Sequence, residues 1–535
     1  MHIMLHFHRY KYFPYEKRLA LRETEALLCV RTRVEDDVVH VDVATEQMQL
    51  IRRLTYFAKA ITDTGESIIP DQTRWEASAN GWHDSSTDLR LRRQSTRYSL
   101  HSLHEYKGRF NPQIVRAIGN LLRLEQDAFV LDPFCGSGTV LLEAAHIGWN
   151  AVGLDLNPLA VMIANAKVDL CHLGLEKFRQ YSKPVLDKVK TLVELVGNCE
   201  EPFDAKLRSH LTKASASHQL PGHEYLERWF PTDVLIQFQV LLHLIEQVQD
   251  TAIKSALKVC LSNAVREVSF QEPADLRIRR RKEPRENYPA LLLFWQEADS
   301  LLESLKNTEG LRHLILPSTH QVAFYRDSRS KQALADANKG FSPKNRPFDA
   351  AITSPPYANA LPYIDTQRLS LVLLGLVEAK EIATTDRALI GSREITNGER
   401  QSLELALESN EAGLPSSIRD FLMDLLNRIR QADVGFRRRN RPALLYKYFA
   451  NMKKVFHAVQ SCLLPGAPFA LVVGTNRTRL DGTQIIIPTP EFLTDIALSE
   501  GFVKECVEEL DTYQRYNLHR ANSINSESLI ILRTE

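Results

Sequence analysis

Apolar residues recur along the chain with two different periods, and the alternation of these periods predicts strands and helices in turn. Residues 128–132 (AFVLD) and 150–156 (NAVGLDL) are short, continuous apolar runs, which are typical of strands buried on both faces. Residues 139–148 (TVLLEAAHIG) have helical spacing and end at a glycine, and residues 111–124 predict a preceding helix with Asn111 as its N-cap. This order of elements predicts a parallel, doubly wound sheet.

The pattern of a buried sheet returns in the second half of the chain, after a long helical stretch. Strands, one of them preceded by a helix and a Pro-Gly turn, are predicted within residues 321–328, 348–353, 447–474 and 528–533. Residues 170–315 are mostly helical in pattern and too long for a loop between adjacent strands. We therefore predict an α/β fold, with a Rossmann-like doubly wound domain formed by residues 98–169 and 316–535 and a helical insert that is a candidate for target recognition.

The first 62 residues alternate between strand-like and helix-like patterns and predict a small α+β N-terminal domain. The His-rich start, MHIMLHFHRY, predicts an edge strand, and no Asp, Glu or Cys stands near it at metal-ligand spacing, so we expect no metal site. Residues 38–43 alternate like a strand, and residues 46–61 (EQMQLIRRLTYFAKAI) predict a helix. Residues 63–97 are polar and predict a linker.

Composition narrows the class of protein. The chain has 535 residues with 67 Lys plus Arg against 66 Asp plus Glu, so any affinity for nucleic acid must come from local basic patches. It contains no uninterrupted apolar stretch of about 18 residues, and its start lacks the apolar centre of a secretory leader, so we expect neither a membrane span nor export. Its seven scattered cysteines fit the reducing cytoplasm.

A glycine turn follows the first buried strand and opens a helix. Glycines there let a ligand approach the backbone, and an acid, Asp155, ends the next strand, about 20 residues on, at the usual distance for gripping ribose hydroxyls. The dinucleotide fingerprint requires a third glycine where Leu141 stands, and no lysine follows as in a P-loop. A ligand with a ribose but no pyrophosphate fits better, and S-adenosylmethionine is the candidate cofactor. The alternative is a tight turn without a ligand.

A second turn, Ser354-Pro355-Pro356-Tyr357, ends the strand predicted at 348–353. The two prolines fix φ and lack N–H groups, so the carbonyls of this turn remain free to accept hydrogen bonds. Together with the serine hydroxyl and the flat tyrosine ring, they suit a planar base with an exocyclic amino group. Catalysis would then consist of positioning and electrostatics during attack on a sulfonium methyl. Methylation of carbon is disfavoured because this turn has no cysteine nucleophile.

The two turns resemble the motifs of the S-adenosylmethionine-dependent amino-methyltransferases of DNA, which methylate cytosine N4 or adenine N6. DPFCGSGT resembles their cofactor motif, SPPY their catalytic motif, residues 104–112 the segment that closes over the methionine end, and YRDS the strand end whose acid contacts adenine. SPPYANA, LIGSRE and LLPGAPFALVVGTN also resemble a bacterial subgroup related to tRNA guanine-N2 methyltransferases. The resemblance implies a catalytic set of Ser354, Pro355, Pro356 and Tyr357, and a cofactor set of Phe110, Asp132, Phe134, Gly136, Gly138, Thr139, Asp155 and Asp327.

Two basic runs are candidates for binding phosphates, since arginine forms bidentate contacts with them. The first lies in the helical insert and the second before the last long helix: Arg277, Arg279, Arg280, Arg281, Lys282 and Arg285; Arg437, Arg438, Arg439 and Arg441. The alternative is that each run is a solvated charged surface.

The leading hypothesis is a cytoplasmic DNA cytosine-N4 methyltransferase of restriction–modification or defence type, with DNA and cognate restriction or defence proteins as partners. Serine in the first position of SPPY is the variant associated with cytosine, and adenine N6 remains open. A tRNA guanine-N2 methyltransferase is the second hypothesis, supported by the N-terminal domain. A binding module without catalysis is disfavoured by the intact SPPY turn. A protein glutamine methyltransferase is disfavoured because it would normally have Asn at the position of Ser354.

Overall fold

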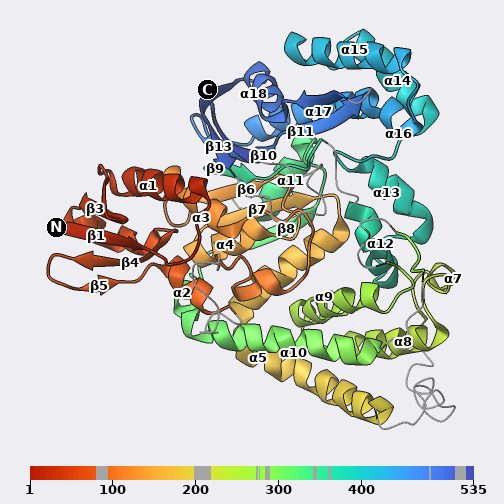
Figure 1. The fold of residues 1–535 in the computed structure, drawn as a ribbon. Helices are drawn as coiled ribbons and strands as arrows, with labels where there is room; N and C mark the ends of the chain where they lie inside the picture. Colours follow the sequence, from red (N-terminus) through yellow and green to blue (C-terminus); the bar gives the residue numbers. More distant parts are fainter. Residues whose placement is uncertain are drawn as a thin grey trace.

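The centre of the protein is a seven-stranded sheet with the strand order β13-β14-β10-β9-β6-β7-β8 (Figure 1). Its strands are β6 (Phe129–Asp132), β7 (Asn150–Asp155), β8 (Gln321–Tyr325), β9 (Ala350–Thr353), β10 (Pro468–Gly474), β13 (Phe502–Asp511) and β14 (Ser526–Thr534). Of these seven, β14 alone runs antiparallel to both of its neighbours. The structure, a computed structural model, describes residues 1–79, 94–197, 219–272, 275, 278–282, 289–341, 346–358, 363–480, 483–511 and 526–535.

Helices cover both faces of this sheet, because its strands are apolar on both faces. Val130 and Ile352 belong to one apolar cluster, whereas their neighbours Leu131 and Ala351 belong to another. On the first face lie α3 (Pro112–Leu121) and α4 (Thr139–Ile147), and on the second lie α11 (Lys331–Phe341), α17 (Arg441–Gln460) and α18 (Thr489–Ser499). The predicted doubly wound α/β fold is confirmed.

The order of the strands identifies where a ligand can enter. The chain proceeds outward from β6 through β7 to β8, and then returns to add β9 on the other side of β6. In such sheets the crevice at the carboxyl ends of the two strands that flank the reversal is the usual ligand site. Here these ends are Asp132, which begins the DPFCGSGT turn, and Thr353, which directly precedes the SPPY turn.

A helical insert separates β7 from β8 (Figure 1), and its apolar cluster also includes Trp75 of the N-terminal unit, Leu142 of the central domain and Ile364. It consists of α5 (Pro158–Gly197), α7 (His223–Leu226), α8 (Thr232–Glu246), α9 (Thr251–Glu267), α10 (Ala290–Thr308) and η3 (Glu309–Leu314). Helix α5 is kinked at Gly174, so the expected domain boundary at residue 170 falls inside a helix. Among the described residues, α5 is also the one helix with the length and apolar content of a membrane span. Of its apolar 18-residue stretch, 61% is buried inside the protein.

A second helical region, which the sequence patterns did not reveal, follows the SPPY turn. Its helices are α12 (Tyr363–Leu373), η4 (Ala379–Glu381), α13 (Ile382–Ala388), α14 (Asn397–Glu408), α15 (Ser416–Gln431) and α16 (Phe436–Arg439). Helix α12 packs against α9 and α5 of the insert, whereas α14 and α15 pack against α17. A short ribbon, β11 (Asn476–Leu480) with β12 (Thr483–Ile487), follows β10.

The N-terminal unit is an antiparallel sheet with the order β2-β3-β1-β4-β5, packed against α1. Its elements are β1 (His2–Phe7), α1 (Pro14–Leu28), β2 (Arg33–Glu35), β3 (Val38–Asp42), η1 (Thr45–Arg53), β4 (Phe57–Thr62), β5 (Ser67–Ile68) and α2 (Asp71–Ala77). The prediction of an edge strand at the start is wrong, because β1 lies at the centre, between β3 and β4.

The helix predicted over residues 46–61 is wrong in its second half. A 3-10 helix covers Thr45–Arg53, and Phe57–Thr62 forms β4, which pairs with β1 along its length. The apolar residues of this segment fit both the helical and the strand period, and pairing with β1 stabilises the strand. The expected linker is also structured in its described first part, where α2 buries Trp75.

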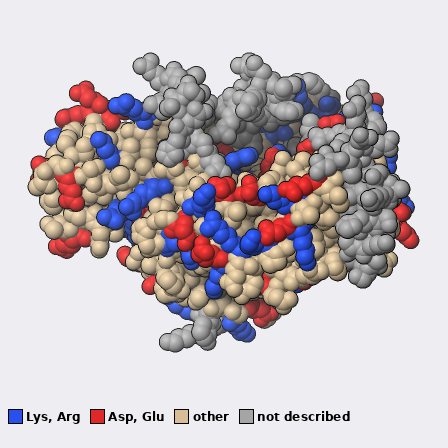
Figure 2. Space-filling model, turned by 90° about the horizontal axis from the view of Figure 1, so that it is seen from below, with Lys and Arg blue, Asp and Glu red and all other residues tan. Residues whose placement is uncertain are grey.

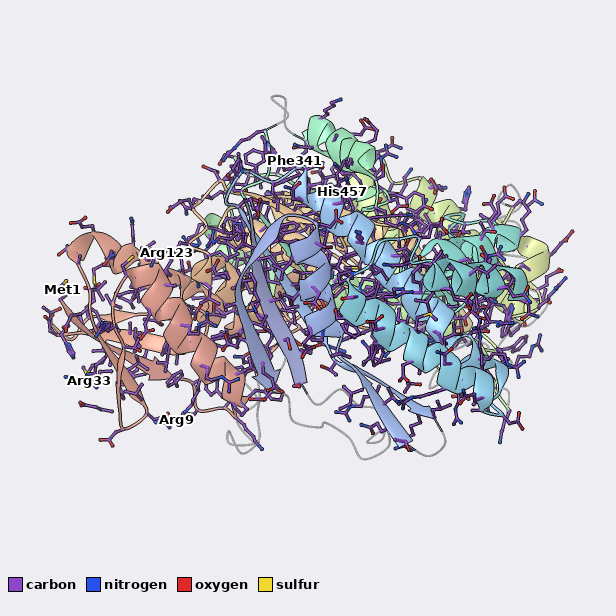
Figure 3. The ribbon with its side chains drawn as sticks, turned by 90° about the horizontal axis from the view of Figure 1, so that it is seen from above. Met1, Arg9, Arg33, Arg123, Phe341 and His457 are labelled. Carbon is purple, nitrogen blue, oxygen red and sulfur yellow. The ribbon has the colours of Figure 1, made fainter. Side chains whose placement is uncertain are left out.

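The N-terminal unit and the first face of the central sheet share one apolar cluster. A buried polar contact joins them as well: the carboxylate of Glu23 on α1 accepts hydrogen bonds from Thr55 and from Asn120 Nδ2 on α3, the latter at 2.8 Å. Figure 3 shows the unit at one side of the molecule, with Met1, Arg9 and Arg33 on it. Because core and contact are shared, we expect this unit to fold together with the sheet.

Candidate active site

The two motif turns meet at one cavity, at the reversal point of the sheet. Phe134 and Gly136 of the glycine turn line it together with Asp155, and all four residues of the Ser354–Tyr357 turn line it from the other side. Two segments that are distant in sequence therefore form one site.

Of the two glycines in the glycine turn, Gly136 lines the cavity and Gly138 does not. Gly136 has φ +48°, and a Cβ there would meet only the ring of Tyr106, at 3.4 Å. Gly138 has φ +76°, and a Cβ there would lie 2.6 Å from Cβ of Ala164 on α5. Gly136 thus leaves backbone open to a ligand, whereas Gly138 allows the start of α4 to approach α5. Thr139, the first residue of α4, is buried.

Asp155 supports the glycine turn from the end of β7. Its Oδ2 accepts a hydrogen bond from the backbone N–H of Gly136 at 2.9 Å, and its Oδ1 accepts one from the N–H of Asn157 at 2.8 Å. Burial raises the pKa of Asp155 to about 6, so that the group is mostly ionised at neutral pH. Each carboxylate oxygen has a second lone pair, which can accept a ligand hydroxyl.

A buried lysine holds the same turn from behind. Nζ of Lys167, on α5, donates to the carbonyl oxygen of Ser137 at 2.8 Å. The side chain is completely buried, and burial holds the pKa of Lys167 well below its usual range. The sequence patterns did not single out this residue.

The residues present fit S-adenosylmethionine. The open backbone at Gly136, the ionised Asp155 and the aromatic Phe134 and Tyr106 line one cavity, and together they offer hydrogen bonds to ribose and apolar surface to a purine. Gly136 and Phe134 would lie along the ligand, and Asp155 would hold its ribose.

The SPPY turn is tied to the glycine turn by Asp132, the last residue of β6. Its Oδ1 accepts hydrogen bonds from Oγ1 of Thr353 at 2.6 Å and from the N–H of Phe134 at 3.1 Å. Burial raises the pKa of Asp132 to about 7. Asp132 does not line the cavity, so the structure places this predicted cofactor residue as a brace between the two turns.

The segment before α3 forms a third wall of the cavity. Tyr106 and Gly108 line it, while Phe110 lines a neighbouring polar cleft between this segment and the helical insert. The residues just before this segment contact the buried Glu143 of α4. The Tyr98 hydroxyl and His101 Nε2 each lie 2.8 Å from its Oε1, and Arg116 Nη2 lies 3.0 Å from its Oε2.

Asp327 is a further predicted cofactor residue that does not line the cavity, as is also true of Phe110, Asp132, Gly138 and Thr139. Its carboxylate forms a bidentate ion pair with Arg329, with a closest distance of 2.7 Å. Burial alone would raise the pKa of Asp327, but the hydrogen bonds from Arg329 lower it. Its two neighbours, Arg326 and Ser328, line the cavity instead.

Several lining residues were absent from the predicted set: Tyr106, Gly108, Asn157, Arg326, Ser328, Leu389 and Ile390. Tyr106 and Gly108 lie in the 104–112 segment that resembles a cofactor-closing element, and LIGSRE contains Leu389 and Ile390. YRDS contains Arg326 and Ser328. The resemblance thus covered six of these seven positions as segments without naming them as site residues.

The arginines of the insert have partners within the protein. Arg281 donates to the carbonyl oxygens of Ser269 and Glu267, at 3.1 and 2.8 Å, and so caps the end of α9. Arg280 donates to the Arg228 carbonyl and lies over the ring of Trp229, and Arg279 lies 3.6 Å from Asp275. Arg277 and Arg285 lie outside the described residues.

The second run is more exposed. Arg437 and Arg438 on α16 are exposed, and Arg437 lies over the ring of Phe436. Arg439, also exposed, donates to the Val434 carbonyl at 3.4 Å. On the face seen in Figure 2, Lys and Arg are mixed with Asp and Glu.

Comparisons with known proteins identify the class to which the chain is similar. Residues 102–188 match a family model described as an RMKL-like methyltransferase domain. The type II methyltransferase M.BsoBI of Geobacillus stearothermophilus is 26% identical over 430 residues, which cover 76% of this chain and 79% of that protein. A tRNA (guanine(10)-N2)-dimethyltransferase of Methanothermobacter thermautotrophicus is 34% identical over 73 residues, 14% of this chain and 21% of that protein.

Among solved structures, TrmN from Thermus thermophilus aligns over 100% of this chain and 99% of its own, with 10% identity and a TM-score of 0.32. This superposition is too loose to argue from, and the fold assignment depends on the strand order above. The resemblance predicted from the two motifs is confirmed: the chain is similar to type II DNA methyltransferases and tRNA guanine-N2 methyltransferases, and it is a methyltransferase that uses S-adenosylmethionine.

Proposed function

We propose that the protein methylates the exocyclic amino group of a nucleobase in DNA, with cytosine N4 as the target atom, in a restriction–modification or defence system. The observation that carries the proposal is the shared cavity, in which the SPPY turn faces the glycine turn. The relative that covers 76% of the chain is named a type II methyltransferase, which supports DNA as the substrate.

Each wall of the cavity has a separate task in this proposal. When bound, S-adenosylmethionine supplies an electrophilic methyl group on sulfur. The Ser354 hydroxyl and the carbonyls beside Pro355 and Pro356 accept hydrogen bonds from the target amine, which orients its lone pair and raises its electron density. The ring of Tyr357 stacks on the extruded base. The chain thus contributes orientation and fixed dipoles without a covalent intermediate.

The proposal extends to the residues outside the cavity. Asp132 keeps the two turns in register, and Asp155 holds ribose hydroxyls. Phosphates of the duplex are assigned to the exposed arginines Arg437, Arg438 and Arg439. The helical insert is the candidate target-recognition domain.

Guanine N2 in tRNA is the second candidate substrate. Its support is the local match of 34% identity to a tRNA dimethyltransferase, together with the N-terminal unit. Adenine N6 in DNA differs from the leading proposal only in the base that the same turn would hold.

The test is mass spectrometry of nucleosides from DNA and from tRNA of cells that express the protein. We expect N4-methylcytosine in DNA, and its loss with Tyr357→Ala, because stacking on an aromatic ring is worth about 1–3 kcal/mol per base and its loss also removes orientation. The variant should retain affinity for S-adenosylmethionine, which serves as the control for folding. Methylguanosine in tRNA alone would transfer the proposal to the second substrate, and N6-methyladenine would change the base.

A further inference from the structure

Tyr357 is joined to an acid from the far end of the chain. Its hydroxyl donates a hydrogen bond to Oε1 of Glu527, on β14, at 2.8 Å. We propose that Glu527 is a positioning residue, which holds the ring of Tyr357 in the plane that stacks on the target base. This assignment rests on the proposed function and deepens it, because it identifies what fixes the stacking ring.

The sheet topology explains why this acid reaches the site. Strand β14 is antiparallel to β10, so its amino end lies at the edge where β9 and β10 have their carboxyl ends. Glu527 stands opposite Gly474, the last residue of β10, and opposite Leu510 of β13. Ladders on both sides therefore fix its backbone, and a carboxylate on a rigid strand is a better anchor than one on a loop.

Tyr357 needs such an anchor. Pro355 and Pro356 fix two φ angles before it, but they do not restrain the torsions of its own side chain. The ring lines the cavity and is only partly buried. The hydrogen bond at its hydroxyl fixes the end of the ring farthest from the backbone and leaves its face available.

The chemistry of the contact also favours a positioning role. Burial raises the pKa of Glu527, and the hydrogen bond from Tyr357 opposes this shift. The contact therefore favours the ionised acid, and hydrogen bonds to an ionised acceptor are stronger than neutral ones. Glu527 is partly shielded from water, which costs free energy, and the hydrogen bond from Tyr357 offsets part of that cost.

The test is a double-mutant cycle with Glu527→Gln and Tyr357→Phe, measured as single-turnover methyl transfer to the DNA or tRNA that the wild type modifies. The first variant keeps an acceptor but removes the charge, and the second keeps the ring but removes the donor. Each should slow transfer about 10-fold or more, since hydrogen bonds to charged groups contribute about 1.5–3 kcal/mol. The double variant should be no slower than Tyr357→Phe alone, because the charge of Glu527 acts through the hydrogen bond that Tyr357→Phe already removes.

Two controls separate this from a general structural effect. Glu509→Gln makes the same change on the neighbouring strand, where the side chain is exposed, and should leave the rate unchanged. The Kd for S-adenosylmethionine should change less than about twofold in Glu527→Gln, because the effect acts on the base side of the cavity. If Glu527→Gln does not fold, Tyr357→Phe alone must still show the loss.

The outcomes that overturn the assignment differ from those that overturn the function. A wild type that modifies nucleic acid while Glu527→Gln and Tyr357→Phe are as fast as it is, or while their losses add independently, overturns the role of Glu527 alone. A wild type that methylates neither DNA nor tRNA overturns the proposed function, and the assignment with it.

Discussion

The glycine turn and the SPPY turn face each other across one cavity, but they are held in place differently. The glycine turn is fixed by residues that are close to it in sequence: Asp155 of β7 and Lys167 of α5 bind its backbone groups, and Gly138 lets α4 pack closely on α5. The SPPY turn has no N–H groups at its two prolines. It is held instead through Thr353 and Tyr357, whose partners Asp132 and Glu527 are distant in sequence.

This difference separates two ways of building a site. A turn that must present backbone to a cofactor can be stabilised locally, because glycines and a nearby acid suffice. A turn that must present free carbonyls and a ring gives up backbone bonds, and the rest of the sheet has to supply side-chain partners. We therefore expect substitutions in the first turn to change stability and cofactor affinity, and those in the second to change the rate of transfer.

The largest effect should follow from filling the space at the glycine turn. Gly138→Ala places a Cβ 2.6 Å from Ala164 at φ +76°, so it adds overpacking to backbone strain. The expected loss is about 2–5 kcal/mol in the free energy of unfolding, measured by urea denaturation. Gly466→Ala is the matched control, because Gly466 has φ +72° but nothing within 4 Å of the added Cβ, and it should lose only about 1–2 kcal/mol. Equal losses would show that close packing at Gly138 does not matter.

The parts of the site that could be predicted from the sequence are those that depend on local contacts. The glycine turn, its strand and its helix follow from local periodicity, and Asp155 follows from its distance to the turn. Glu527 could not be predicted, because its contact with Tyr357 depends on β14 entering the sheet antiparallel beside β10. The strand at Phe57–Thr62 was missed for a similar reason, since its partner β1 lies far away in sequence.

An intermediate effect should follow from neutralising the acid of the glycine turn. Asp155→Asn weakens the hydrogen bond to Gly136 and removes the charge expected to hold ribose, so the Kd for S-adenosylmethionine should rise about tenfold or more in calorimetry at pH 7.5. Since the pKa of Asp155 is raised to about 6, its ionised form is lost as the pH falls through that value. Wild-type affinity should therefore decrease below about pH 6 and approach that of the variant.

Asp327→Asn is the comparison for that experiment. The carboxylate of Asp327 is paired with Arg329 and lies outside the cavity wall, so the Kd for the cofactor should change less than with Asp155→Asn. A loss as large as that of Asp155→Asn would return Asp327 to the cofactor site.

The smallest effects concern the two arginine runs, which look alike in sequence but differ in their long-range contacts, as the two turns do. Arg281→Gln removes donors to two carbonyls at the end of α9 and should cost about 1–2 kcal/mol of stability without changing how binding depends on salt. Arg438→Gln changes an exposed side chain, so stability should stay the same. If Arg438 contacts a phosphate, the slope of log K against log salt should decrease by about 0.9 for duplex DNA. The reverse pattern would be a smaller slope with Arg281→Gln and an unchanged slope with Arg438→Gln. It would assign the nucleic-acid contact to the helical insert.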